Sequence, residues 1–176
     1  MSIATVTIGS QLDRPQVVTV AQGPRGPAGA TVSAYGQASR ITDGTVSITT
    51  AGQYFQPDLV VVLDTANTFG MELSDDYEFA IKNDSGATRI FQVYASIDAA
   101  GGNNNSLGLK LAIDGTAIDQ TECRAQTSGS GHEAKLVTSW LVSLANGQSV
   151  SPLITNFTTT GTLTVKRGRI VAHALT

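Results

Sequence analysis

Apolar and polar residues alternate along much of this 176-residue chain with the period of two that is typical of β-strands. The alternation is clearest in residues 89–97 and 106–113. We expect one face of each strand to point into a core. The inward residues are Phe91, Val93, Ala95 and Ile97 in the first strand and Leu107, Leu109, Leu111 and Ile113 in the second.

Further strand candidates are separated by glycine, asparagine and aspartate turn signals. The run from Leu59 to Leu63 is continuous enough for a strand buried on both faces, whereas residues 35–42 are hard to assign. Gly168 marks a possible β-bulge that reverses the inward face of the last strand. The candidates are residues 45–50, 58–64, 68–73, 77–82, 122–127, 133–144, 149–157 and 162–175.

Residues 133–144 allow two interpretations. Leu136, Trp140 and Leu144 also fit a helical face with a period near four. We favour a strand with Ala134 and Val142 on the same face as these three, because turn-forming residues stand on both sides of the segment.

The turn signals favour hairpins. Residues 101–105 are Gly-Gly-Asn-Asn-Asn, which predicts a hairpin between the two clearest strands, and Asp114-Gly115 predicts the next turn. Pro152 raises doubt that its strand is interior, since proline cannot donate to a central ladder. Eight to ten short strands without a convincing helix predict an all-β fold, an antiparallel jelly-roll sandwich preceded by an extended N-terminal arm.

A glycine repeat divides the chain. Residues 23–31 are three Gly-X-Y triplets whose glycines are Gly23, Gly26 and Gly29. Glycine at every third position is what a collagen triple helix requires at its axis, although a short extended linker has the same composition. We therefore expect an arm over 1–22, a linker over 23–31 that runs along a trimer axis, and a jelly-roll domain over 32–176.

The arm contains two strand-like runs, residues 2–8 and 16–21, and too few apolar residues for a core of its own. We expect it to add strands to a neighbouring subunit or to another protein, because unpaired strand edges are satisfied by pairing. A disordered tail is the alternative. The candidate partner-binding residues are Ile3, Val6, Ile8, Val17, Val18 and Val20.

Composition excludes several functional classes. Charged residues are only 14% of the chain and the net charge is −3, so we expect no nucleic-acid partner. The one tight basic group, Lys166-Arg167-Gly168-Arg169, predicts strand-face charges, subunit pairing or contact with an acidic partner. No apolar run is long enough to span a membrane, and the N-terminus does not look like a signal peptide, so folding in a cytoplasm is expected.

No residue pattern indicates catalysis or a cofactor. Cys123 and His132 are nine residues apart but lack a nucleophile signature, and we interpret them as a structural thiol and a loop histidine. A single cysteine excludes an intrachain disulfide, and with His132 and His173 it provides too few ligands for a structural zinc. We expect a non-enzymatic protein without cofactors.

Several segments in the C-terminal half resemble the trimeric jelly rolls of bacteriophage virion proteins, which are similar to tumour-necrosis-factor and complement heads. The resemblance covers about residues 77–175 and lies in the pattern of strands and turns, including residues 91–97, 101–105, 107–115, 124–129, 144–150 and 156–165. It implies a homotrimer. A small head with an arm and no long shaft resembles a capsid decoration (cement) protein that binds the major capsid protein or another virion protein.

Two other roles remain open within this resemblance. One is a component of a tail or head fibre, and the other is a receptor- or carbohydrate-binding jelly-roll module. In the decoration role, three weak contacts joined in one rigid trimer would gain avidity. The expected location is the virion, after assembly in the host cytoplasm.

Overall fold

The computed structural model describes residues 4–8, 16–20, 33–40, 42–57, 59–65, 68–129 and 131–175. The chain forms two compact units, Met1–Val32 and Ser33–Thr176. Within these residues no helix is long and apolar enough to cross a membrane. The strands are β1 (Ala4–Ile8), β2 (Gln16–Val20), β3 (Tyr35–Arg40), β4 (Gly44–Ile48), β5 (Val62–Leu63), β6 (Met71–Leu73), β7 (Ile81–Asn83), β8 (Arg89–Ala100), β9 (Ser106–Ile113), β10 (Thr116–Gln126), β11 (Glu133–Leu144), β12 (Ser149–Asn156) and β13 (Gly161–Ala174).

The smaller unit is a two-stranded antiparallel sheet. β1 pairs with β2, and the register places Val6 opposite Val18 and Ala4 opposite Val20. The two strands predicted in the arm are thus present, and in this structure each is the pairing partner of the other.

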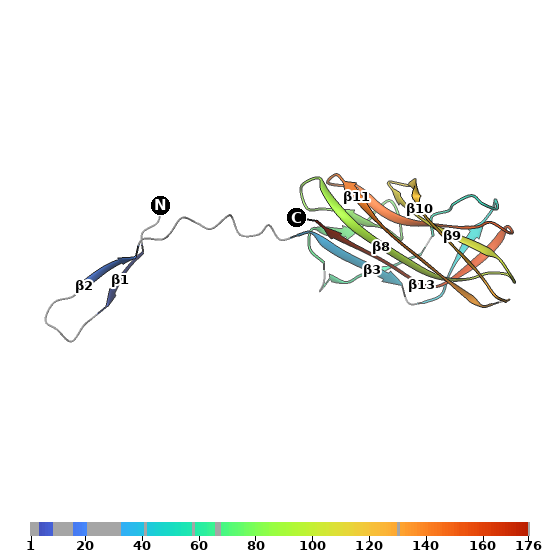
Figure 1. Ribbon diagram of the computed structural model, residues 1–176, viewed down its shortest axis with the longest axis horizontal. Coiled ribbons are helices and arrows are strands. Elements are labelled where there is room, and N and C mark those ends of the chain that lie inside the picture. The colour runs from blue at the N-terminus through green and yellow to red at the C-terminus, as the bar shows by residue number, and fades with distance from the viewer. Residues whose placement is uncertain are drawn as a thin grey trace. The chain divides into compact units, whose positions relative to one another are not determined.

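The larger unit consists of two antiparallel sheets. The five-stranded sheet has the order β10-β9-β12-β7-β6, and the six-stranded sheet has the order β11-β8-β13-β3-β5, with β4 also paired to β13. The long strands β8, β13 and β3 run side by side in Figure 1. This is an antiparallel jelly roll, and the predicted fold class is confirmed.

Most connections cross between the sheets. β8 belongs to the six-stranded sheet and β9 to the five-stranded sheet, so the predicted hairpin at residues 101–105 is wrong. Asn104 does adopt the expected left-handed conformation (φ 54°), but this backbone geometry serves a crossover as well as a hairpin. The Asp114-Gly115 turn joins β9 directly to β10, with φ of 47° and 77°, as predicted.

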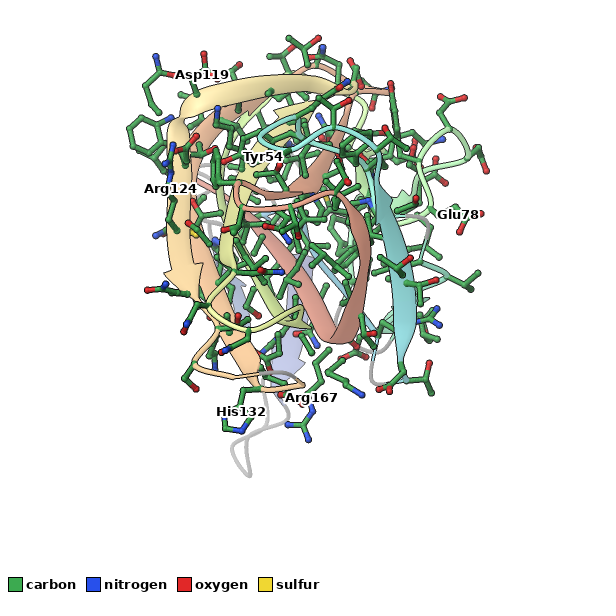
Figure 2. The ribbon with its side chains drawn as sticks, turned by 90° about the vertical axis from the view of Figure 1, so that its right-hand side faces the viewer. Tyr54, Glu78, Asp119, Arg124, His132 and Arg167 are labelled. Carbon is green, nitrogen blue, oxygen red and sulfur yellow. The ribbon has the colours of Figure 1, made fainter. Side chains whose placement is uncertain are left out.

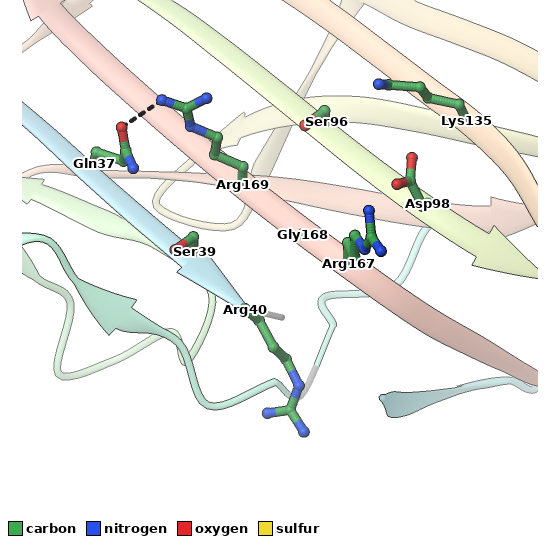
Figure 3. A pocket seen from close by; sticks show the side chains of 9 residues that line it. All are labelled: Gln37, Ser39, Arg40, Ser96, Asp98, Lys135, Arg167, Gly168 and Arg169. Carbon is green, nitrogen blue, oxygen red and sulfur yellow. Dashed lines mark hydrogen bonds between the residues drawn. The ribbon is translucent and has the colours of Figure 1, made fainter. Parts of the chain in front are cut away.

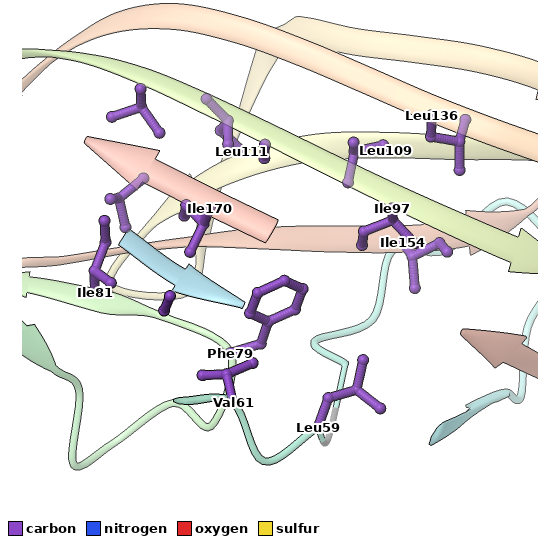
Figure 4. Close-up of a cluster of buried hydrophobic side chains, with 14 of the residues drawn as sticks. Leu59, Val61, Phe79, Ile81, Ile97, Leu109, Leu111, Leu136, Ile154 and Ile170 are labelled. Atoms are coloured by element: carbon purple, nitrogen blue, oxygen red, sulfur yellow. The ribbon is translucent and has the colours of Figure 1, made fainter. Parts of the chain in front are cut away.

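The core lies between the two sheets (Figure 4). All four predicted inward residues of β8 are fully buried, and so are Leu107, Leu109 and Leu111 of β9. Ile113 is partly buried against the same cluster. β11 pairs with β8 along its whole length, which excludes the helical alternative for residues 133–144.

Two sequence expectations about burial are wrong for residues at the edges of the six-stranded sheet. Residues 59–63 are not buried on both faces, because Leu59 and Val61 are buried while Val60 and Val62 are 70% and 72% exposed. β5 is the edge strand of its sheet, and one of its faces is open to solvent. Trp140 shares the inward parity of Leu136 and Val142 but is 43% exposed.

Pro152 lies in an interior strand, since β12 runs between β9 and β7. The Ile154 N–H donates to the Phe55 carbonyl, away from β9, and the backbone N of Pro152 points to the same side because the direction alternates along a strand. β7 pairs only with Ser149 and Val150. The proline therefore falls in a gap between two partners, where no ladder donor is required.

β13 contains the predicted reversal. Its register with β8 shifts between Val165 and Arg167, so Lys166 is the extra residue of a bulge. Leu163 and Val165 are buried before the bulge, and Ile170 and Ala172 after it. Gly168 is required for packing, because a Cβ there would lie 2.6 Å from the Phe79 ring.

Candidate functional site

The sequence-predicted site residues fall in the smaller unit or outside the described residues. Val6 and Ile8 lie in β1, and Val17, Val18 and Val20 lie in β2. The register brings Val6 and Val18 together as a cross-strand pair. The remaining predicted residues, Ile3, Gly23, Gly26 and Gly29, lie outside the part of the chain that the structure describes.

A second candidate surface was missed by sequence reasoning. We call it the open face, meaning the side of the six-stranded sheet that points away from the core. Most of the large exposed hydrophobic residues lie on this face, and we call them the apolar patch. They are Val62, Phe69, Ile90, Tyr94, Val137, Leu141 and Leu175.

The strand register arranges the patch in rows across the sheet. One row runs from Leu141 through Gln92, His173 and Tyr35 to Phe69. The next row consists of Ser139, Tyr94, Val171 and Gln37. Residues directly opposite each other lie on the same side of a sheet, so these rows form one continuous surface.

The exposure of the patch is high for apolar side chains. Leu141 is 55% exposed, Ile90 is 53% exposed and Val137 is 40% exposed. Exposed apolar side chains gathered on one face, here interleaved with Gln92, His173 and Gln37, are typical of an interaction site. The signal was present in the sequence, because Ile90, Tyr94 and Leu141 occupy outward positions of strands whose other outward residues are mainly polar.

The edge strand β11 adds an aromatic residue beside the patch. Trp140 is 43% exposed although its neighbours of the same parity, Leu136 and Val142, are buried. It lines a hollow of about 360 Å³ with Gln92, Ser139 and Leu141. Apolar surface is thus exposed both on the open face and at its β11 edge.

The outer side of the five-stranded sheet is different in character. Lys110 lies 4.5 Å from the centre of the Tyr54 ring, and Arg124 lies 3.8 Å from the centre of the Phe157 ring. The two rings meet edge to face at 6.0 Å. Tyr54, Asp119 and Arg124 lie toward one end of the larger unit, and Arg167 and His132 toward the other (Figure 2). We call the polar group around Tyr54 the cation cluster.

Glu122 joins the two cations of this cluster. Its carboxylate lies 3.1 Å from the Lys110 Nζ and 2.6 Å from an Arg124 guanidinium nitrogen. Burial opposes ionisation, but the hydrogen bonds from Lys110 and Arg124 outweigh it and lower the pKa of Glu122 below its usual value. Burial and the nearby Glu122 carboxylate raise the pKa of Tyr54. These contacts leave Tyr54 and Phe157 packed edge to face, each with a cation over its ring.

Glu122→Gln is expected to lower stability by about 1 kcal/mol at pH 7, because it removes two charge-assisted contacts. Because the pKa of Glu122 is lower in the folded protein than the unfolded value of 4.5, its ionised carboxylate stabilises the fold above pH 4.5. This stabilisation is lost as the pH falls through the folded pKa. The difference in melting temperature between the two proteins should therefore shrink below about pH 4.5. Asp119→Asn is the matched control, since Asp119 is 81% exposed and should contribute less.

The residues considered for catalysis have structural contacts. Cys123 lies in β10, and burial raises the pKa of its thiol, which is opposite to what a nucleophilic cysteine requires. The His132 ring lies 2.9 Å from the Ser128 hydroxyl, within the turn before β11. Among the residues that the structure describes, no group of three or more His, Cys, Asp or Glu side chains is placed to hold a metal ion.

No protein-family model and no curated protein matches this sequence. Solved structures that resemble it include Eiger TNF from S. frugiperda, with a TM-score of 0.56 and 10% identity over 82% of this chain and 93% of that one. Murine APRIL at pH 8.5 and at pH 8.0 each gives a TM-score of 0.51 and 10% identity over 80% of this chain and 99% of that one. The likeness shows that the chain has a TNF-like jelly-roll fold.

Proposed function

We propose that this chain is a non-enzymatic virion structural protein, a homotrimeric capsid decoration protein that attaches to the shell through its N-terminal arm. The observation that supports the proposed trimer is the apolar patch on the open face. The shell and the phage context come from the resemblance of residues 77–175 to virion jelly rolls and from the Gly-X-Y triplets.

The apolar surface favours a ring. The patch lies on the open face, whereas Trp140 projects at the β11 edge, so two different surfaces of one protomer are available for contact. When the edge of one protomer packs on the face of the next, the contact is head to tail, and such contacts form a ring if the rotation between successive protomers closes. A ring of three agrees with the trimer that the sequence resemblance implies.

The arm supplies the attachment. Residues 1–32 form a unit separate from the jelly roll, and the β1-β2 pair gives it a defined backbone of ten residues for pairing with another protein. Three such arms on one trimer would engage the shell together. Joined contacts exceed the single-site affinity by ~100-fold or more when all can bind at once.

The carbohydrate-binding alternative finds little support in the cation cluster. Sugar recognition through aromatic stacking requires an open ring face, and Tyr54 and Phe157 are instead packed against each other and covered by Lys110 and Arg124. The fibre alternative would place the protein at a tail or head fibre, and immunogold labelling of intact particles separates it from an even distribution over the shell.

Deletion of residues 1–22 is expected to abolish shell binding and leave the trimer intact, because the two activities lie in different units. The measurement is co-sedimentation of the full and truncated proteins with purified capsid shells that lack the protein, with light scattering for the mass. The full protein should bind at a fixed ratio to the shell subunits.

A control variant tests the jelly roll separately. Ala117→Asp changes an exposed position on the five-stranded sheet and should bind shells as the unmodified protein does. Undiminished shell binding by the truncated protein would contradict the arm, and a protein that binds no shell at all would contradict the decoration role.

A further inference from the structure

The basic end of the open face forms a groove that adjoins the apolar patch, because Ser96, Arg169 and Ser39 stand in the row between Val137 and Val62. It has a volume of about 430 Å³ and lies across β3, β13, β8 and β11 (Figure 3). This volume is within the range of small-molecule sites. Its lining is Gln37, Ser39, Arg40, Ser96, Asp98, Lys135, Arg167, Gly168 and Arg169.

The lining contains four cationic side chains and one carboxylate. The register places Asp98 between Lys135 on β11 and Arg167 on β13. Arg40 points away from the other lining residues, and its guanidinium donates to the main-chain carbonyls of residues 42, 43 and 60 at 2.8–2.9 Å. Arg40 is thus a loop-holding residue, and three cations remain to face the groove.

These three cations differ from others in the chain. Lys82, Lys110 and Lys166 each form a salt bridge with a carboxylate at 3.2 Å or less. Within the part of the chain described here, Lys135, Arg167 and Arg169 form none at 4 Å or less. Arg169 is oriented by Gln37, whose side-chain oxygen accepts a hydrogen bond of 2.5 Å. Asp98 is the one carboxylate in the lining, so three cations against one carboxylate leave an excess of positive charge.

The bulge at Lys166 creates this arrangement. After the register shift, Arg167 and Arg169 both have the outward parity of β13, with Gly168 turned inward between them. Arg169 stands in the same row as Ser96 and Ser39, whose hydroxyl groups are hydrogen-bond donors. The backbones that carry these side chains are paired strands, so the sheet fixes their spacing.

We propose that this groove binds a ligand carrying phosphate or sulfate groups. Guanidinium groups match the geometry of such oxyanions in two parallel hydrogen bonds, and the Lys135 ammonium adds a third positive charge. The seryl hydroxyls complete the donor set. The site goes beyond the proposed assembly role, and all of its lining residues come from one protomer.

Calorimetric titration of the full chain at low ionic strength tests the proposal, with inorganic pyrophosphate as one probe and a sulfated heparin disaccharide as the other. Binding by either probe should weaken at least ~10-fold in Arg167→Gln/Arg169→Gln, and several-fold in Lys135→Gln. Binding should also weaken with added salt. The probe that binds more tightly shows whether the ligand carries phosphate or sulfate groups.

Lys166→Gln is the matched control, because it removes the same charge one residue away from Arg167 and outside the groove lining. It should change the affinity less than twofold. The single variant Arg167→Gln should have an unchanged melting temperature, because the Arg167 side chain donates no hydrogen bond within the described residues. This result would show that the substitution leaves the fold intact. The proposal is overturned if neither probe binds, or if Lys166→Gln weakens binding as much as Arg167→Gln.

Discussion

Leu141→Asp is expected to convert the proposed trimer into monomers of 18.3 kDa. Leu141 is 55% exposed in the protomer and lies at the β11 end of the apolar patch, beside Trp140, so we expect it to be buried in the proposed assembly. An unpaired carboxylate buried in an interface costs on the order of 3 kcal/mol, and the trimer contains three copies. Light scattering at a fixed protein concentration gives the mass directly.

Trp140 gives a second measurement of the same change. It is the single tryptophan of the chain, and it lies next to Leu141 with 43% of its side chain exposed. Burial of Trp140 in the assembly shifts its fluorescence to shorter wavelengths, and dissociation should reverse that shift. Tyr94→Glu on the neighbouring strand should act in the same way.

Ala117→Asp is the control for charge alone, because Ala117 is exposed on the other sheet. It should remain trimeric. A Leu141→Asp protein that keeps three times the chain mass would exclude the open face as the interface, and an unmodified protein that is monomeric would exclude the trimer itself.

Phe79→Ala is expected to cost about 4 kcal/mol, the largest effect on the stability of the fold. Phe79 is fully buried between the sheets and packs against Gly168 of β13. The loss combines the transfer of an aromatic ring to water with the cavity that it leaves. For a domain of this size the melting temperature should fall by roughly 10 °C, measured by thermal unfolding at one concentration.

The contact with Gly168 makes this result specific. In the unmodified protein, Gly168→Ala would place a Cβ 2.6 Å from the Phe79 ring and should cost about 1–3 kcal/mol. When Phe79 is already alanine, the added methyl group meets no ring and should cost much less. Additive losses in the double variant would show that the two residues are not coupled.

The core of the jelly roll was predictable because a strand with one buried face alternates apolar and polar residues along its sequence. The alternation in residues 91–97 placed the four predicted inward side chains of β8 correctly. The reversal in β13 was also visible, since Val165 and Ile170 are of opposite parity, although the bulge lies at Lys166 and not at Gly168. Both predictions rest on local patterns that only one face of a strand can satisfy.

Strand pairing was not predictable in the same way. The Gly-Gly-Asn-Asn-Asn segment at 101–105 looks like a hairpin, and the structure uses it to pass from one sheet to the other. The turn chemistry fixes the local backbone but not the partner strand. The continuous run Leu59–Leu63 likewise suggested a doubly buried strand, and its place at a sheet edge exposes Val60 and Val62.

The sequence by itself determined that the chain is an all-β protein with a separate N-terminal arm, because periodicity and glycine spacing are local properties. Only the tertiary structure decided which surfaces face outward together. Leu141, Tyr94 and Phe69 are far apart in the chain and join in one patch through the register of four strands and the bridge between Tyr35 and Phe69. Lys135, Arg167 and Arg169 gather in one groove for the same reason, since side-chain neighbours across a sheet are set by long-range pairing.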